Sequence, residues 1–330
     1  MLVDTHHRVI DYLRIAVTDR CNLRCVYCMP QEGIEPLPHG QILSYEEILR
    51  VARVAVGLGI RKVRLTGGEP LVRRDLERLV GALARIPGIQ DLSMTTNGVL
   101  LRERIRDLRN AGLKRVNVSM DSLDPDRYRA ITRGGELERV WGGIMAAMEA
   151  GMRPVKINVV AMGEHNGEEV LSFARLSVAW PVEVRFIERM PLGAQEGCTA
   201  GGFLSADSIL ARLRQAFSLE PLEVKSGNGP AQLYRLDKGR GTIGIIAPMT
   251  RHFCHTCNRL RLTPDGKLRT CLFSDQEMDL KGLLRSGASD QALRERILEA
   301  ISRKPSRGSP EAQADLRVKK CVRPMSRIGG

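Results

Sequence analysis

The feature that most constrains the fold is an alternation, between about residues 8 and 190, of short β-branched runs with longer helical stretches. Such alternation is typical of βα units, which build a parallel sheet. Six strands are expected, over 13–17, 62–66, 92–95, 116–120, 155–160 and 182–187. Because six βα units are too few for a closed eight-stranded barrel, the sequence predicts an α/β fold with an open, partial (β/α)6 barrel of TIM-like form.

Helices are expected between these strands. The segment from Ser44 to Glu47 has the form of a capping box, and it opens a helix that should end near Gly57 or Gly59. Further helical stretches are expected over 75–84, 103–111, 139–150 and 168–176.

Three cysteines follow the first predicted strand with the spacing Cys-x3-Cys-x2-Cys, at Cys21, Cys25 and Cys28. A loop of this kind can ligate three irons of a four-iron, four-sulfur cluster and leave the fourth iron without a protein ligand. Structural zinc is the alternative, but it requires four closed ligands, and no fourth Cys or His lies nearby in the sequence. The spacing therefore favours an iron–sulfur cluster whose open iron is a chemical site.

A second group of three thiols lies far downstream, at Cys254, Cys257 and Cys271. Between the last two, strand-like pieces are joined by a Pro-Asp-Gly turn at 264–266. Zinc is a stronger alternative here, because Cys-x2-Cys is half of a zinc ribbon. The candidates for a fourth zinc ligand are His252, His255, Cys198 and Cys321. The spacing alone leaves zinc and a second open cluster both in view.

Composition points to an intracellular protein with an anionic partner. Eight cysteines, six of them in two tight groups, do not resemble a disulfide framework. No signal-peptide core and no uninterrupted apolar run of membrane-spanning length is visible, so a cytoplasmic protein without a membrane partner is expected.

The formal charge of +13 suggests that the partner is a polyphosphate small molecule or a nucleic acid. At 4% aromatic residues, the chain has little material for stacking on single-stranded nucleic acid.

Polar segments follow three of the predicted strands, at 66–70, 95–98 and 119–122, and the first two of them contain glycine. In β/α barrels the catalytic groups lie at the carboxyl ends of the strands, so these segments should share one rim with the first cysteine loop. In the first of them, Gly67 and Gly68 allow a ligand close to the backbone, and Glu69 offers an acceptor.

Five cations lie on the predicted strands themselves: Arg14, Lys62, Arg64, Lys156 and Arg185. Burying them without anions would be costly. Any one of them can pair with a local carboxylate, but five that converge on one cavity require a polyanion. A triphosphate, with about four negative charges, suits the forked geometry of arginine.

The first cysteine motif resembles that of the radical S-adenosylmethionine (SAM) enzymes, which have an aromatic residue before the last cysteine, here Tyr27. The second triad, with the arginines that follow Cys257 and the end of the chain at 328–330, narrows the resemblance to the GTP 3′,8-cyclase family, which opens molybdenum cofactor biosynthesis. The resemblance runs from about Leu13 to Gly330. It implies a radical SAM partial barrel with a C-terminal extension that carries a second iron–sulfur cluster.

The resemblance also implies the cofactors and the site. Two 4Fe-4S clusters and SAM are the expected cofactors, with one cluster on Cys21, Cys25 and Cys28 and the other on Cys254, Cys257 and Cys271. The SAM pocket is expected to be lined by Tyr27, Gly68, Ser119 and Met190. The positions expected to contact GTP are Arg14, Lys62, Arg64, Thr95, Lys156, Arg185, Arg259, Leu260 and Arg261.

The chemistry implied by the resemblance uses a 5′-deoxyadenosyl radical, which takes the hydrogen from carbon 3′ of GTP. The carbon radical then adds to carbon 8, giving (8S)-3′,8-cyclo-7,8-dihydro-GTP. No side chain is therefore expected as a catalytic residue. The implied partners are GTP, a flavodoxin- or ferredoxin-type electron donor and a downstream cyclic pyranopterin monophosphate synthase, without nucleic acid. A homodimer is compatible with the resemblance.

Three segments are expected: the radical SAM barrel at 1–190, the extension with the second cluster at 191–302, and a flexible basic tail at 303–330. The tail is either inert or, as the resemblance favours, long enough for Gly329 and Gly330 to reach the active site. Two other functions compete: a two-cluster radical SAM enzyme that modifies RNA, and a non-catalytic zinc-ribbon protein that binds nucleic acid.

Overall fold

The computed structural model describes residues 1–191, 202–223, 229–306 and 323–329. In this part of the chain twelve strands form one sheet, in the order β12-β11-β10-β1-β2-β3-β4-β5-β6-β9-β8-β7. The six strands predicted from the sequence are present, and each end lies within one residue of its predicted position. They are β1 (Tyr12–Ala16), β2 (Lys62–Thr66), β3 (Asp91–Thr96), β4 (Arg115–Ser119), β5 (Val155–Ala161) and β6 (Val182–Glu188). Successive members pair in parallel, as βα units require.

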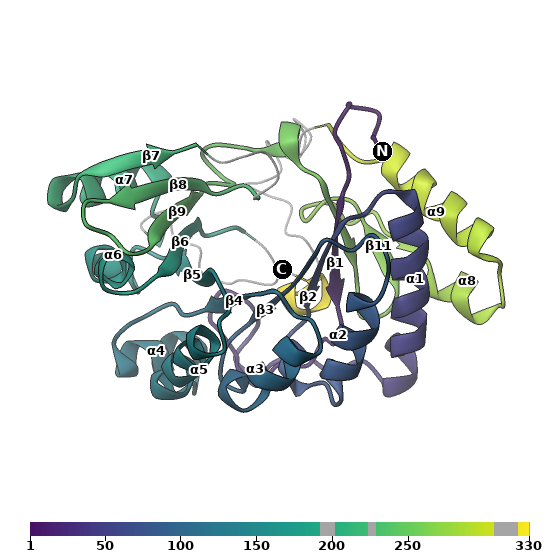
Figure 1. The fold of residues 1–330 in the computed structure, drawn as a ribbon, viewed down its shortest axis with the longest axis horizontal. Helices are drawn as coiled ribbons and strands as arrows, with labels where there is room; N and C mark the ends of the chain where they lie inside the picture. Colours follow the sequence, from purple (N-terminus) through teal and green to yellow (C-terminus); the bar gives the residue numbers. More distant parts are fainter. Residues whose placement is uncertain (192–201, 224–228, 307–322, 330) are drawn as a thin grey trace.

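Helices cover the outer face of the curved sheet (Figure 1). They are α1 (Tyr45–Leu58), α2 (Leu76–Ala84), α3 (Leu101–Asn110), α4 (Pro125–Thr132), α5 (Leu137–Glu149) and α6 (Val170–Ala179). The predicted capping box of α1 is confirmed: Oγ of Ser44 accepts from the backbone N–H of Glu47, whose carboxylate accepts from the N–H of Ser44. The helix ends at Gly59, whose φ of +128° is accessible to glycine.

The helix α4 was not predicted from the sequence. Its local signals are nevertheless present, because Asp124 caps the helix by accepting from the N–H of Arg127 and Pro125 occupies the first turn. Short 3₁₀ helices complete the described part of the chain: η1 (His39–Gln41), η2 (Pro70–Val72), η3 (Gly167–Glu169), η5 (Cys254–Thr256) and η6 (Met325–Arg327).

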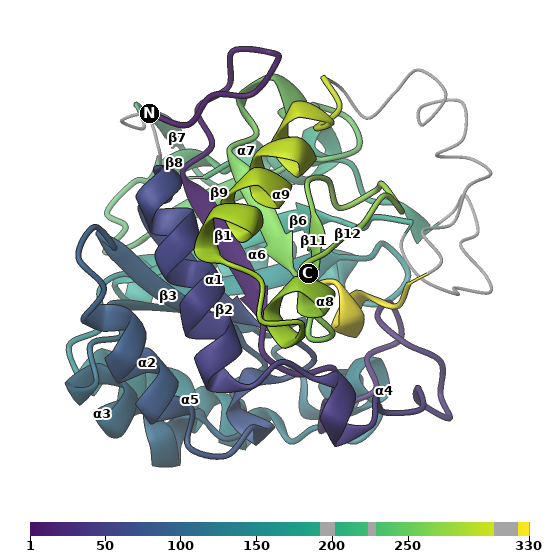
Figure 2. The ribbon, with the colours of Figure 1, turned by 90° about the vertical axis from the view of Figure 1, so that its right-hand side faces the viewer.

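The C-terminal half extends the same sheet at both edges. Its strands are β7 (Leu219–Leu222), β8 (Gln232–Leu236), β9 (Thr242–Ile246), β10 (Arg259–Leu262), β11 (Lys267–Arg269) and β12 (Met278–Asp279). The strand β9 pairs in parallel with β6, and β10 pairs in parallel with β1. The predicted turn at 264–266 is confirmed as the link of the β10–β11 hairpin, where Gly266 has a φ of +76°. The helices are α7 (Ala206–Ala216), α8 (Lys281–Arg285) and α9 (Asp290–Ser302), and α9 packs beside α1 (Figure 2).

The alternation of side chains along each strand separates a hydrophobic core from a polar interior. On β1, Leu13 and Ile15 are buried in the core beneath the helices. Tyr12 and Arg14 instead line a cavity on the other face of the strand. The concave face of the sheet therefore carries the groups that could bind a polar ligand.

Candidate functional site

A cavity of about 350 Å³, within the usual range for ligand sites, brings all six clustered cysteines together. The first triad follows the carboxyl end of β1. Cys257 precedes β10 and Cys271 follows the antiparallel β11, so the second triad lies at the amino end of β10. Because β10 runs parallel to β1, the two triads lie toward opposite ends of the strands. The cavity between them is lined by residues of the barrel strands.

The first triad lies in a setting that disfavours isolated thiolates. Burial, and then the neighbouring Cys28, raises the pKa of Cys25 well above its ordinary value. Burial, and then Cys21, raises the pKa of Cys28 to about 12. Three thiolates here would need a cationic centre, and the irons of a cluster supply one. The donor set, three free cysteines on one loop, fits a 4Fe-4S cluster.

The two glycines after β2 are required by a close approach of two loops. A Cβ on Gly68 would lie 2.3 Å from the carbonyl oxygen of Arg20, and one on Gly67 would lie 2.4 Å from that of Thr18. The backbone N–H of Gly68 donates to the carbonyl of Thr18 at 2.8 Å. The absence of a side chain at Gly67 and Gly68 therefore lets this loop pack against the residues that precede the first cysteine. Gly68 also lines the cavity.

Glu69, in the same loop, is fully buried and accepts three hydrogen bonds from the chain. Its carboxylate receives the N–H groups of Leu71 (3.0 Å) and Asn97 (2.6 Å) and the hydroxyl of Thr96 (2.7 Å). Burial raises its pKa to about 7 despite these donors. Glu69 thus holds the ends of β2 and β3 together at the rim.

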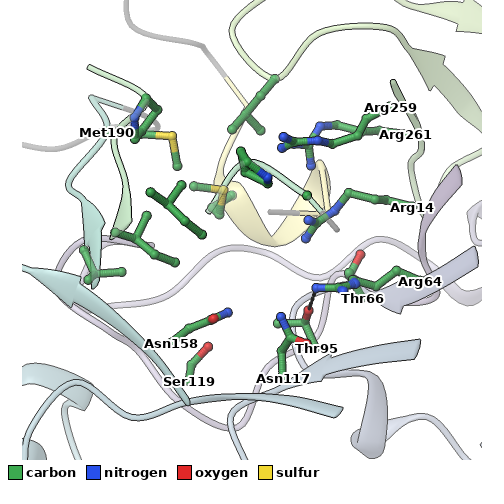
Figure 3. A pocket seen from close by; sticks show the side chains of 18 of the residues that line it. Arg14, Arg64, Thr66, Thr95, Asn117, Ser119, Asn158, Met190, Arg259 and Arg261 are labelled. Carbon is green, nitrogen blue, oxygen red and sulfur yellow. Dashed lines mark hydrogen bonds between the residues drawn. The ribbon is translucent and has the colours of Figure 1, made fainter. Parts of the chain in front are cut away.

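The residues expected to line a SAM pocket all lie on this cavity: Tyr27, Gly68, Ser119 and Met190. The hydroxyl of Tyr27 donates to Asp121 at 2.8 Å, and burial raises the pKa of Asp121 to about 6. Figure 3 shows Met190 and Ser119 away from the arginines.

Sequence reasoning missed two asparagines on the cavity wall, Asn117 on β4 and Asn158 on β5. The side-chain oxygen of each is buried and has no hydrogen-bond partner within the described residues. Buried polar atoms are normally paired, so both oxygens are candidates for a ligand contact. Both residues lie within predicted strands, but no local signal indicated that their side chains face the cavity.

Cations gather on one side of the cavity, as Figure 3 shows for Arg14, Arg64, Arg259 and Arg261. Strand register explains the grouping, because Arg14 lies opposite Arg64 of β2 on one side and Arg261 of β10 on the other. The other expected GTP positions that line the cavity are Lys62, Thr95 and Arg185. Lys62 also pairs with Asp11 at 2.9 Å, and Arg64 donates to the hydroxyl of Thr95 at 3.4 Å.

Two of the expected GTP positions do not line the cavity. Lys156 is buried and its ammonium pairs with Glu183 at 3.0 Å, while Glu183 also pairs with Arg185. Burial, and then the charge of Arg185, lowers the pKa of Lys156 to about 8. Leu260 is fully buried in the hydrophobic core, because it faces away from the arginines on either side of it along β10.

The arginines repel one another in the absence of an anion. Burial, and then the charge of Arg261, lowers the pKa of Arg14 well below its ordinary value. Burial, and then Arg259, lowers the pKa of Arg261 to about 10. An anion placed among these guanidinium groups would relieve the repulsion, and phosphate oxygens match their donors.

The second triad differs from the first in its electrostatics. Burial raises the pKa of Cys257, but the charges of Lys304 and then Arg259 outweigh burial and lower it to about 7. Among the described residues no three His, Cys, Asp or Glu side chains are grouped so as to hold one metal ion. That finding concerns a single ion, whereas a cubane takes each cysteine on a different iron. Three free cysteines beside cations fit an anionic cluster.

The described C-terminal segment, residues 323–329, reaches the cavity inside the curve of the sheet (Figure 1). Arg14 and Arg261 both donate to the carbonyl of Gly329, at 3.2 Å and 2.6 Å. Gly329 has a φ of +69°, and a Cβ there would lie 2.7 Å from the hydroxyl oxygen of Thr66. The described tail thus reaches the arginines. Gly330, Cys198 and Cys321 lie outside the described residues.

Comparison with known proteins places the fold and the first cysteine loop in a class. The Radical SAM superfamily matches residues 15–177, and Molybdenum Cofactor Synthesis C matches residues 182–310. Among solved structures, SuiB of Streptococcus suis has a TM-score of 0.60 at 14% identity, over 98% of this chain and 78% of that one. Methylornithine synthase has a TM-score of 0.51 at 22% identity, over 63% and 62%. The chain has the radical SAM fold, whose enzymes use a 4Fe-4S cluster and SAM.

The relatives define the family within that class. The GTP 3′,8-cyclase of Thermodesulfovibrio yellowstonii is 52% identical, and that of Pelotomaculum thermopropionicum is 51% identical, each over 99% of both chains. This chain belongs to the GTP 3′,8-cyclase family. In the described part of the chain, no helix has the length and apolar character needed to cross a membrane.

Proposed function

We propose that this chain converts GTP to (8S)-3′,8-cyclo-7,8-dihydro-GTP, the first step of molybdenum cofactor biosynthesis. The observation that carries the proposal is a single cavity, lined by two cysteine triads and by arginines from β1, β2 and β10. A cationic pocket of this kind requires a polyanion, and a nucleoside triphosphate supplies one. Family membership selects GTP.

In this proposal both triads hold 4Fe-4S clusters with one open iron. Cys21, Cys25 and Cys28 hold the cluster that binds SAM, with Tyr27, Gly68, Ser119 and Met190 around the SAM. Cys254, Cys257 and Cys271 would hold the second cluster, whose open iron would be available to bind the guanine of GTP. Support for the second cluster comes from three free cysteines, of which Cys257 has its pKa lowered by the nearby charges of Lys304 and Arg259.

The proposed GTP site uses residues that line the cavity: Arg14, Lys62, Arg64, Thr95, Arg185, Arg259 and Arg261. Lys156 and Leu260 do not line the cavity and are proposed to act indirectly, by positioning residues that do. Lys156 acts through Glu183, which it shares with Arg185, and so fixes the guanidinium that faces the ligand. Leu260 anchors β10 in the core and so fixes the arginines on either side of it.

The cluster and SAM, when bound, supply a 5′-deoxyadenosyl radical. The protein's own side chains then bind, orient and exclude water, and none acts as a catalytic residue. The arginines hold the triphosphate, while Asn117 and Asn158, whose side-chain oxygens have no partner among the described residues, offer acceptors on the cavity wall. Holding the reactants at near-attack distance is the main contribution of such a site.

The division of the chain is part of the proposal: a radical SAM barrel at 1–190, an extension at 191–302 and a tail at 303–330. The two family matches, at 15–177 and 182–310, support the first boundary. A flavodoxin- or ferredoxin-type protein would supply electrons, and a cyclic pyranopterin monophosphate synthase would take the product. The proposed homodimer can be tested by sedimentation.

The test is anaerobic incubation of the reconstituted protein with SAM, dithionite and GTP, with product mass analysis and with ATP and RNA in parallel. We expect 5′-deoxyadenosine and a cyclised product from GTP only. Metal analysis should give about eight iron atoms per chain if both triads hold cubanes. Stoichiometric zinc at the second triad would refute the second cluster, and RNA modification without GTP turnover would refute the assigned substrate.

A further inference from the structure

The buried side chain of Lys304 contacts the second cysteine triad. Lys304 follows α9 and is only 3% exposed. Its ammonium donates to the sulfur of Cys257 at 3.6 Å and to the carbonyl of Arg259 at 3.0 Å. It also donates to the carbonyl of Thr270, which precedes Cys271. One side chain therefore ties together both chain segments that carry the triad.

The position of Lys304 is fixed from the other side by the N-terminal segment. Arg8, itself buried, donates to the carbonyls of Cys254 (2.9 Å), Pro305 (2.7 Å) and Ser306 (3.1 Å). Its orientation is held by an ion pair with Asp4 at 2.6 Å. Residues next to Lys304 and the first cysteine of the triad are thus bound to one guanidinium.

The charge of Lys304 lacks a carboxylate partner within the described residues, because its hydrogen bonds go to two carbonyls and one sulfur. Arg259, the first residue of β10, adds a second positive charge near Cys257. A buried cation without a counter-charge is costly. The arrangement becomes favourable when an anionic group, such as a thiolate-ligated cluster, occupies the triad.

We propose that Lys304 is a positioning residue that hydrogen-bonds the Cys257 sulfur and raises the reduction potential of the second cluster. The inference rests on the proposed function, which places a cluster on this triad. Hydrogen bonds to ligating sulfurs and local charge are established controls of cluster potential. A fixed positive charge stabilises the form that has gained one electron, so its removal makes the cluster harder to reduce.

The experiment isolates the second cluster. A parent variant with Cys21, Cys25 and Cys28 changed to Ala is reconstituted anaerobically, and its potential is measured by spectroscopic redox titration with dithionite. Lys304→Met keeps the length of the side chain and removes the charge. We expect its one-electron reduction to be disfavoured at least tenfold, which is 59 mV toward more negative potential. Lys304→Arg should lie between, since it keeps the charge in a different shape.

The control is Lys114→Met, which removes the same charge from an exposed lysine bonded to the carbonyl of Gln90. Its potential should equal that of the parent. If Lys304→Met fails to load in the parent, the intact-cysteine version is analysed: half the iron with a folded protein supports the positioning role, and global unfolding overturns it. A loaded parent whose potential is unchanged by Lys304→Met overturns the inference alone. A parent that binds no iron overturns the second cluster and the inference together.

Discussion

Replacing Arg261 by Ala should weaken GTP binding while leaving the free protein at least as stable. Arg261 is 5% exposed and lies opposite Arg14 across the β1–β10 pair. A charge-assisted hydrogen bond to phosphate contributes about 1.5–3 kcal/mol, so its loss should raise the Kd for GTP roughly 10- to 150-fold. Burial and the charge of Arg259 already lower the pKa of Arg261 to about 10, so the free protein bears a cost that Ala removes.

The assay is anaerobic calorimetric titration of GTP into reconstituted protein, with thermal unfolding of the same samples. Arg261→Lys should recover part of the affinity, because the charge remains but the fork is lost. Arg104→Ala, which breaks a surface pair with Glu77, is the matched control and should bind GTP normally. ATP should bind the wild-type protein less well than GTP.

The Ala variant should bind GTP more weakly without losing stability, and this combination distinguishes a binding role from a structural one. A purely structural role for Arg261 would lower the unfolding midpoint by several degrees along with the affinity. We expect the midpoint to stay unchanged or to rise. An unchanged Kd for GTP in the Ala variant, or equal affinity for ATP and GTP, would refute the assignment of the arginines to this substrate.

Three further predictions concern the cysteines, a glycine and a carboxylate. Changing Cys254, Cys257 and Cys271 to Ala should abolish GTP cyclisation but spare uncoupled SAM cleavage. The same change at Cys21, Cys25 and Cys28 should abolish SAM cleavage. Loss of both activities in the first variant, with its SAM cluster intact, would contradict this division of roles. Gly68→Ala should displace the loop against the carbonyl of Arg20, cost about 1–3 kcal/mol of unfolding free energy and reduce iron loading, while Gly57→Ala, whose Cβ meets nothing within 4 Å, should not. Asp265 pairs with Arg323, and its pKa is lowered to about 2, so its stabilisation of roughly 2 kcal/mol is present above pH 4 and lost as pH falls toward 2. Chemical denaturation of Asp265→Asn should therefore differ from wild type at pH 6 and approach it near pH 2, and a constant gap would argue against the ion pair.

Local sequence signals predicted the six barrel strands and α1 because each depends on neighbouring residues. Alternation along 62–66 and the capping box at Ser44 contain their own information. The helix α4 has comparable local signals in Asp124 and Pro125, so the sequence also contains the information for this helix.

The pairing of strands that are far apart in the sequence could not be predicted from local patterns. The strand β9 joins β6 although more than fifty residues separate them, and β10 returns to β1 from the other end of the chain. The partner of Lys156 likewise depends on the β5–β6 register, which sets it opposite Glu183. From the sequence alone, the ammonium of Lys156 could pair with a carboxylate or face a cavity. The β5–β6 register settles this by setting Lys156 opposite Glu183.

Tertiary contacts also explain the parts of the site that were not anticipated. Asn117 and Asn158 lie on predicted strands, but nothing local distinguishes a cavity-facing asparagine from a surface one. Lys304 lies just after α9, and its contact with Cys257 depends on the packing of the C-terminal segment against the β10–β11 hairpin.

The central claim is that this cavity brings carbon 3′ of GTP to the adenosyl radical. The most direct measurement uses GTP carrying deuterium at carbon 3′, incubated anaerobically with the reconstituted protein, SAM and dithionite. The account predicts 5′-deoxyadenosine one mass unit heavier than normal, and a cyclised nucleotide that has lost the deuterium. Unlabelled 5′-deoxyadenosine beside a cyclised product that retains deuterium would contradict it.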